Sequence, residues 1–141
     1  MAFRYDYATE ALTTENLTFR PSETSMTILE LLNHIYQLAK VTDCVLNNQE
    51  IEKINTNLSF ELLREETLKL YIKSSKEIKK MTYLELVNCT FKPKNKSITF
   101  PFWNLINGSI ADALTHVGQL NSWRRISGNP VPKNNPCIGE P

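Results

Sequence analysis

The stretch "TILELLNHIYQLAKVTDCVL", residues 27–46, decides the fold because its apolar side chains recur at helical spacing. Thr27 and Glu30 stand three positions apart at its start, and such a pair is typical of a capping box that begins a helix. We therefore predict a long helix from about residue 28 to 48 that ends in the Asn47-Asn48 loop. His34 lies on the flank of the apolar stripe, where a side chain reaches a neighbouring helix and still meets water.

Two shorter signals place helices on either side of this one. Ser59 is a good N-cap for a helix whose apolar positions continue to about Lys80. Before residue 27, the segment "FRYDYATEALT", residues 3–13, favours a short first helix of about three turns. Its apolar residues lie near one face, so this helix too can pack against a core.

The last helix is predicted to begin at Thr99, with Pro101 near its first turn, and to run without a break past residue 120. Gly128 can end it in a left-handed backbone conformation. We expect Gly108 and Gly118, both inside this helix, to permit close contact with a neighbouring helix.

Residues 81–98 are the least helical part of the chain. A short hairpin across 84–100 and an irregular crossover both fit the residues there, and both stay open. Antiparallel helices around a shared apolar core form a four-helix bundle. The prediction is thus an all-α, single-domain four-helix bundle over residues 1–141, with this crossover before the last helix.

Composition and charge exclude several classes of protein. The formal net charge of +1 predicts no strong attraction to nucleic acid or to a membrane. No apolar run reaches the length of a membrane span, and the N-terminal residues lack the apolar segment of a signal peptide. The odd number of widely spaced cysteines argues against a disulfide framework; they are Cys44, Cys89 and Cys137. We expect a cytoplasmic protein with neither a nucleic-acid nor a membrane partner.

The charge is distributed unevenly, however. Residues 1–70 carry 6 Lys/Arg and 11 Asp/Glu, whereas residues 71–141 carry 10 Lys/Arg and 4 Asp/Glu. A basic zone without interleaved aromatics lies in the second half, and it consists of Lys73, Lys76, Lys79, Lys80, Lys92, Lys94 and Lys96. Opposite charges on the two halves favour their association within one fold.

Three polar side chains make a candidate metal site. Asp112 and His116 are four residues apart and share one face of the last helix. If that face packs against His34, two imidazoles and a carboxylate converge, and this set suits a divalent ion such as Zn, Ni or Fe. The alternative is that both histidines are hydrogen-bonded at the edge of the core, with Asp112 as a neighbour.

The segments "SMTILELLNHI" at 25–35 and "HVGQL" at 116–120 resemble the DinB/YfiT-like superfamily. The resemblance covers about residues 15–133, and it includes "FRPSET" before the long helix and "RRISGNPVP" after the last one. It implies an up-down-down-up arrangement with a long crossover. It also implies a divalent metal held by three histidines, of which His34 and His116 match two. The third position is occupied here by Asp112, which is also a competent ligand.

The resemblance implies a metal-dependent hydrolase or a thiol transferase, with Zn or Ni as the ion and Fe or Mn as further candidates. The substrate would be a small molecule or a thiol cofactor, and Gln119 would act beside the ligands. A non-catalytic helical binding protein with a degenerate metal site is the alternative. We also expect a homodimer, with Trp123, Arg124 and Arg125 either at the dimer contact or serving to pack the helix end and complement its dipole.

Overall fold

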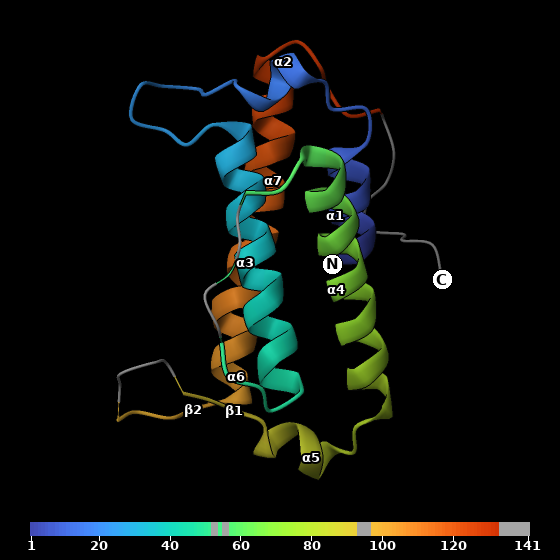
Figure 1. Cartoon of the computed structure of the whole chain (residues 1–141), viewed down its shortest axis with the longest axis vertical. Helices are drawn as coiled ribbons and strands as arrows, with labels where there is room; N and C mark the ends of the chain where they lie inside the picture. The colour runs from blue at the N-terminus through green and yellow to red at the C-terminus, as the bar shows by residue number, and fades with distance from the viewer. Residues whose placement is uncertain (52–53, 55–56, 93–96, 133–141) are drawn as a thin grey trace.

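The computed structural model describes residues 1–51, 54, 57–92 and 97–132, and these residues are mostly helical (Figure 1). This agrees with the all-α prediction, to which the structure adds two short strands. In chain order the elements are α1 (Ala2–Thr9), α2 (Thr14–Leu17), α3 (Ile28–Leu46), α4 (Phe60–Lys80), α5 (Tyr83–Asn88), β1 (Thr90–Phe91), β2 (Phe100–Pro101), α6 (Phe102–Leu105), η1 (Ile106–Ile110) and α7 (Ala111–Ile126).

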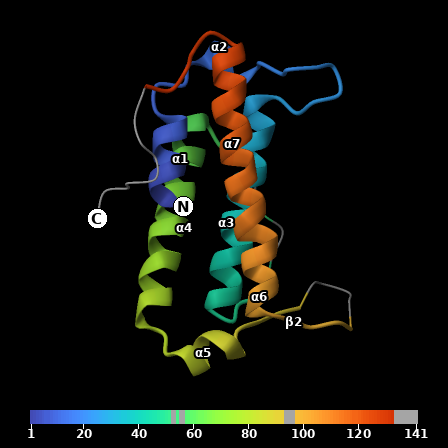
Figure 2. The same ribbon diagram turned by 180° about the vertical axis from the view of Figure 1, so that it is seen from behind.

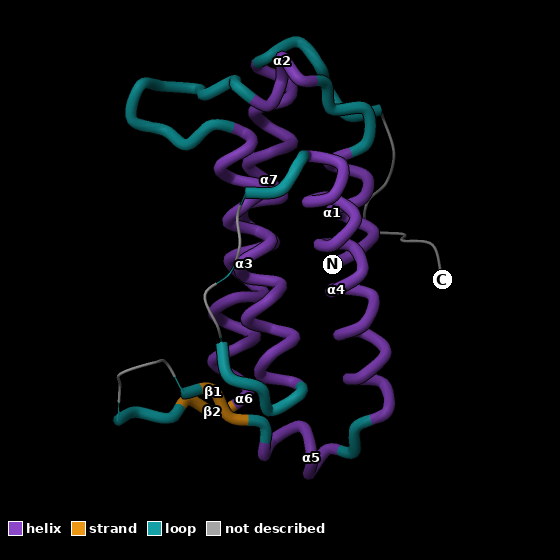
Figure 3. Tube along the Cα trace, viewed as in Figure 1, coloured by secondary structure: helices purple, strands orange, loops and turns teal. Residues whose placement is uncertain are grey.

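The helices α1, α3, α4 and α7 form a ring of neighbours. Helix α3 contacts both α4 and α7, and α1 contacts the same two helices from the other side. In Figure 1, α3 and α4 both run downwards, whereas α1 and α7 run upwards. Because α3 and α4 are parallel, the chain between them has to return along the length of the helices (Figure 3).

Helix α3 begins at the predicted capping box. The Glu30 amide donates to Thr27 Oγ1 at 3.1 Å, and the Thr27 amide donates to Glu30 Oε2 at 2.7 Å. The helix ends at Leu46, slightly before the predicted residue 48, because Asn48 has a left-handed backbone with φ of 52°.

The core lies between the four neighbouring helices. Its α3 side chains, which include Ile28, Leu31, Leu32 and Ile35, are almost completely buried. They pack in one cluster with residues of the other three helices, among them Tyr5, Ala8, Leu63, Leu70, Tyr71, Ala113, Val117 and Leu120. Burying each large apolar side chain contributes about 1.5–3 kcal/mol, so this cluster is the main source of stability.

The crossover before α7 is a hairpin preceded by a helix. Strands β1 and β2 pair antiparallel with Phe91 opposite Phe100, which agrees with the hairpin alternative. Residues 84–88, which the hairpin alternative included, are helical instead and belong to α5. This helix begins at a capping box that was not predicted: the Glu85 amide donates to Thr82 Oγ1 at 3.3 Å, and the Glu85 carboxylate accepts from the Thr82 amide at 2.8 Å.

The prediction of one unbroken last helix was wrong. The backbone leaves the helical region at Gly108, with φ of −96° and ψ of −106°, so the short α6 and η1 precede α7. The expectation of close helix contact at Gly108 and Gly118 was also wrong, because a Cβ atom at either position would meet nothing within 4 Å. Gly128 does end α7 in a left-handed conformation, with φ of 81°, as predicted.

Arg124 joins the end of α7 to the end of α1. Its side chain is 1% exposed, and Nη1 donates to the carbonyls of Ala8 and Glu10 at 2.8 Å each. Nε donates to the Asn129 carbonyl at 2.9 Å. This guanidinium is therefore committed within its own chain. A homodimer stays a prediction, and in this conformation Arg124 does not supply its contact.

Replacing Arg124 by Ala should lower the free energy of unfolding by about 3 kcal/mol, since buried carbonyls of α1 lose a charged donor. Chemical denaturation measures this loss. Arg125→Ala is the matched control, because Arg125 is exposed and the change should stay within about 0.5 kcal/mol. Equal losses in the two variants would contradict the assignment.

Tyr5 makes the fold sensitive to alkali. Burial raises the pKa of this fully buried phenol to about 12, and the Thr67 hydroxyl and Arg64 only partly oppose the shift. In the unfolded chain the Tyr5 phenol ionises near pH 10. The Tyr5 contribution to stability is therefore intact below pH 10 and is lost as the pH rises to about 12. Tyr5→Phe should reduce the loss over this range by about 2 kcal/mol, measured by denaturation at each pH. Identical alkaline losses in the two proteins would refute this role.

Candidate metal centre

The three predicted site residues come from two antiparallel helices in contact. His34 lies in the second turn of α3, on the flank of its buried face, and its side chain is 33% exposed. Asp112 lies in the first turn of α7 and is 47% exposed, whereas His116, one turn later, is only 15% exposed. The group thus extends from the edge of the core to solvent.

The structure brings these side chains together. Asp112 lies between the two imidazoles, with Oδ2 at 3.3 Å from His34 Nε2 and Oδ1 at 3.3 Å from His116 Nε2. The imidazole rings meet edge to face, with centroids 4.7 Å apart and an angle of 83° between their planes. One potential ligand atom from each residue lies within 4.8 Å of the others.

Gln119 orients His116. Its Oε1 lies 2.7 Å from His116 Nδ1. A carbonyl oxygen only accepts, so Nδ1 carries the proton in this contact and Nε2 is the atom presented to Asp112 and His34. Such a partner on the far ring nitrogen is the usual support of a metal-binding histidine.

The donor set fits a divalent ion in both chemistry and spacing. Two atoms bound to one ion by bonds of about 2.1 Å lie roughly 3.0–3.6 Å apart. Each separation from Asp112 falls in this range, but the two involve different carboxylate oxygens. With one atom taken from each residue, the three lie within 4.8 Å of one another, so small side-chain movements of roughly one ångström would bring all three to one ion. The same distances also suit a carboxylate hydrogen-bonded between two imidazoles, which is the alternative left open by the sequence.

A buried hydrogen bond holds the start of α7, which carries Asp112, against α3. Thr42 Oγ1 of α3 lies 3.0 Å from Ser109 Oγ of η1, and both side chains are buried. Ser109 directly follows the kink at Gly108 and precedes Asp112 by less than one helical turn. The hydroxyl pair therefore holds the start of α7 against α3 and helps set the direction in which Asp112 points. Neither the kink nor this pair was predicted, and the glycine was the only local signal.

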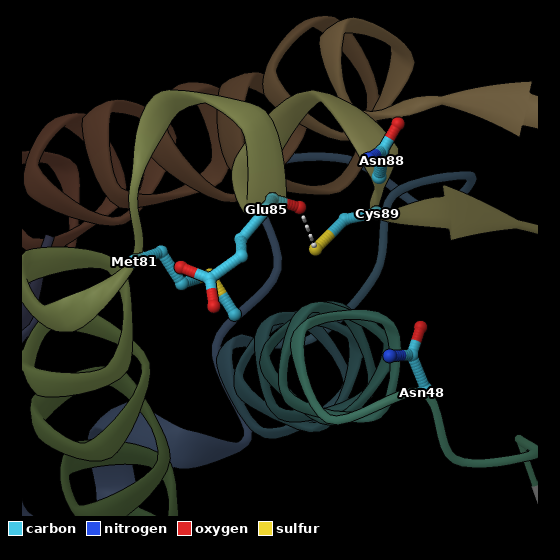
Figure 4. Close-up of a pocket in the computed structure, with 5 residues that line it drawn as sticks. All are labelled: Asn48, Met81, Glu85, Asn88 and Cys89. Carbon is cyan, nitrogen blue, oxygen red and sulfur yellow. Dashed lines mark hydrogen bonds between the residues drawn. The ribbon is translucent and has the colours of Figure 1, made fainter.

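A pocket lies at the far end of α3, away from the candidate metal site (Figure 4). This pocket of about 330 Å³ is lined by Asn48, Met81, Glu85, Asn88 and Cys89. The Cys89 thiol donates to the Glu85 carbonyl at 3.5 Å, and burial raises its pKa. No lining residue is a histidine or a lysine that could activate the thiol, so Cys89 lacks the surroundings of a nucleophile.

No protein-family model matches the chain, and no curated protein matches it in sequence. Within the described residues, no helix combines the length and apolar character needed to cross a bilayer.

Gln119→Ala should weaken Zn²⁺ binding about 10–100-fold, because His116 loses the acceptor that orients its ring. Isothermal titration of the purified protein with zinc measures the change. Ser122→Ala is the control: this exposed residue lies one turn further along α7, and its hydroxyl donates only to the Gly118 carbonyl. If Gln119→Ala bound Zn²⁺ as tightly as the wild type, Gln119 would have no role in the site.

Proposed function

We propose that this chain is a DinB-like four-helix-bundle protein that binds a divalent metal ion through His34, Asp112 and His116. The observation that carries the proposal is the convergence of these side chains from two helices, with Asp112 3.3 Å from each imidazole. Helical bundles build metal sites from carboxylate and histidine side chains on facing helices, and this group has that composition.

The exposure of the site supports a role beyond holding the fold together. Asp112 and His34 are 47% and 33% exposed, so an ion and further small ligands can reach them from solvent. Structural zinc sites are closed by four protein ligands, whereas catalytic ones keep a position for water or substrate. Three protein ligands beside solvent fit the second description.

The arrangement of the helices supports the DinB-like part of the proposal. Two helices running each way, a long return between α3 and α4, and the Gly128 end of α7 are the features that the resemblance implies. The departure is Asp112, where the resemblance implies a third histidine. An anionic ligand lowers the net charge of the site and still suits Zn, Ni, Fe or Mn.

The chemistry we propose is hydrolysis or thiol transfer. A bound divalent ion lowers the pKa of a coordinated water or thiol to near neutrality. His116, held by Gln119, and His34 would each direct Nε2 at the ion, and Asp112 would offer the ion a carboxylate oxygen. The small-molecule substrate would enter from the exposed side of Asp112.

Elemental analysis of protein purified without a His-tag and loaded with Zn²⁺ or Ni²⁺ tests the proposal. We expect a stoichiometric ion in the wild type and its loss in His34→Ala. The fold should survive, with unfolding free energy within about 1 kcal/mol of wild type, since the His34 side chain is partly exposed. Asp112→His should tighten binding, because a third imidazole replaces a shorter ligand.

Gln37→Ala is the matched control, since Gln37 is a partly exposed residue one turn further along the same helix. It should keep the ion. A wild type that takes up no metal, or a His34→Ala variant that binds as tightly as Gln37→Ala, would contradict the proposal. A non-catalytic protein whose histidines only hydrogen-bond Asp112 would then be the better interpretation. If the metal binds, assays of ester and thiol substrates with and without it decide between the two chemistries.

A further inference from the structure

One end of the molecule exposes large apolar side chains. Tyr83 and Leu84 of α5 are 75% and 67% exposed, Ile98 beside β2 is 57% exposed, and Trp103 of α6 is 54% exposed. Helix α6 contacts α5 and both strands. These elements lie together at the end of the long helices opposite α2 in both views (Figures 1 and 2). We call these four side chains the apolar end.

Lysines lie close to the apolar end. The described residues 71–92 and 97–101 contain five lysines, two glutamates and no arginine. Lys76, Lys79 and Lys80 are exposed in the last turns of α4, and Lys92 is exposed next to β1. Lys80 pairs with Glu77 at 3.0 Å, whereas no salt bridge within the described residues involves Lys76, Lys79 or Lys92. Most of this positive charge is therefore available to a partner.

The opposite end of the molecule has no comparable excess of positive charge. The segment 10–30, which includes α2 and leads into α3, carries four glutamates and one arginine. Arg124 and Arg125 at the end of α7 lie at this same end, where Arg124 donates to the Glu10 carbonyl. Unbalanced positive charge is therefore concentrated at the apolar end, and an anionic surface would attract that end more than the other.

We propose that the apolar end docks on the surface of an anionic phospholipid bilayer, with the long helices directed away from it. Trp and Tyr side chains favour the headgroup level, and aliphatic tips such as Leu84 and Ile98 gain by insertion beneath it. Lysines near the surface add electrostatic attraction to anionic lipids. The absence of a bilayer-spanning helix in the described residues is compatible with such peripheral binding. The proposal replaces the expectation of no membrane partner, which considered net charge and spanning segments alone.

Two other partners fit these observations less well. A second copy meeting through the same end would bring two sets of lysines together, which like-charge repulsion disfavours. Nucleic acid would attract the lysines, but binding it would not bury the exposed side chains of Leu84 and Ile98 in an apolar environment. The zone also lacks arginine, the residue best suited to phosphate recognition in nucleic acids.

Co-sedimentation with vesicles tests the proposal. We expect the wild type to bind vesicles of phosphatidylcholine mixed with phosphatidylserine, and not phosphatidylcholine alone. Lys76→Gln combined with Lys79→Gln should weaken the partition about 25-fold, at about fivefold for each lysine. Leu84→Ser should weaken it as well, because less apolar surface is inserted.

Two controls keep the interpretation specific. Arg125→Gln and Ile126→Ser alter one exposed cation and one exposed apolar side chain at the end of α7, far from the apolar end, and both should bind as the wild type does. Circular dichroism should show that every variant is folded. The proposal would be overturned if the wild type did not bind the mixed vesicles, or if the control variants lost as much binding as the test variants. It would also be overturned if the protein bound duplex DNA more tightly than the vesicles and Leu84→Ser left that DNA binding unchanged. None of these readouts involves the metal ligands.

Discussion

The packing of α3 between α4 and α7 is the constraint on which the rest of the structure depends. Its buried stripe, which includes Leu31, Leu32 and Ile35, supplies one wall of the core and fixes the rotation of the helix. That rotation leaves His34 at the edge, where it faces α7 and is still partly exposed. Because α3 and α4 run in the same direction, the same packing also imposes the long return between them. Fold and candidate site thus share one cause.

Polar contacts at the two ends of α7 fix its position on the neighbouring helices more precisely than apolar packing alone does. Apolar contact alone tolerates some sliding and rotation of one helix on another, whereas a buried hydrogen bond does not. At the start of α7 the Thr42–Ser109 pair holds the chain against α3. At its other end Arg124 donates to the carbonyls of Ala8 and Glu10 and so attaches α7 to α1. Asp112 and His116 lie on the helix between these two points, and this is why their side chains can have a defined position without being buried.

Charge is organised on two scales in this molecule. Locally, Asp112 offers one oxygen to each imidazole, and Asp43 accepts from Lys73 at 2.9 Å across α3 and α4. Over the whole molecule, the segment 10–30 carries four glutamates, whereas exposed lysines are concentrated in the last turns of α4 and next to β1. The candidate metal site lies along the side of the α3–α7 pair, and His34 is about 20 Å along α3 from the apolar end, given a rise of 1.5 Å per residue. The proposed metal binding and the proposed surface docking therefore involve separate parts of the molecule.

The sequence by itself determined α3 and α4 with their caps, the end of α7 and the residues of the candidate site. Periodic apolar side chains, the Thr27 and Glu30 box and Gly128 are local signals, read correctly because neighbouring residues alone decide them. The spacing of Asp112 and His116 is local in the same sense. The Gly108 kink, the α5 helix and the burial of Arg124 emerged only in the structure. The approach of His34 to Asp112 was predicted only on the condition that the two helix faces pack together and through the family resemblance, and the structure supplied that packing. Apart from the overlooked Thr82 and Glu85 box, these features depend on contacts between residues distant in the chain, and no local pattern encodes the direction from which a second helix arrives.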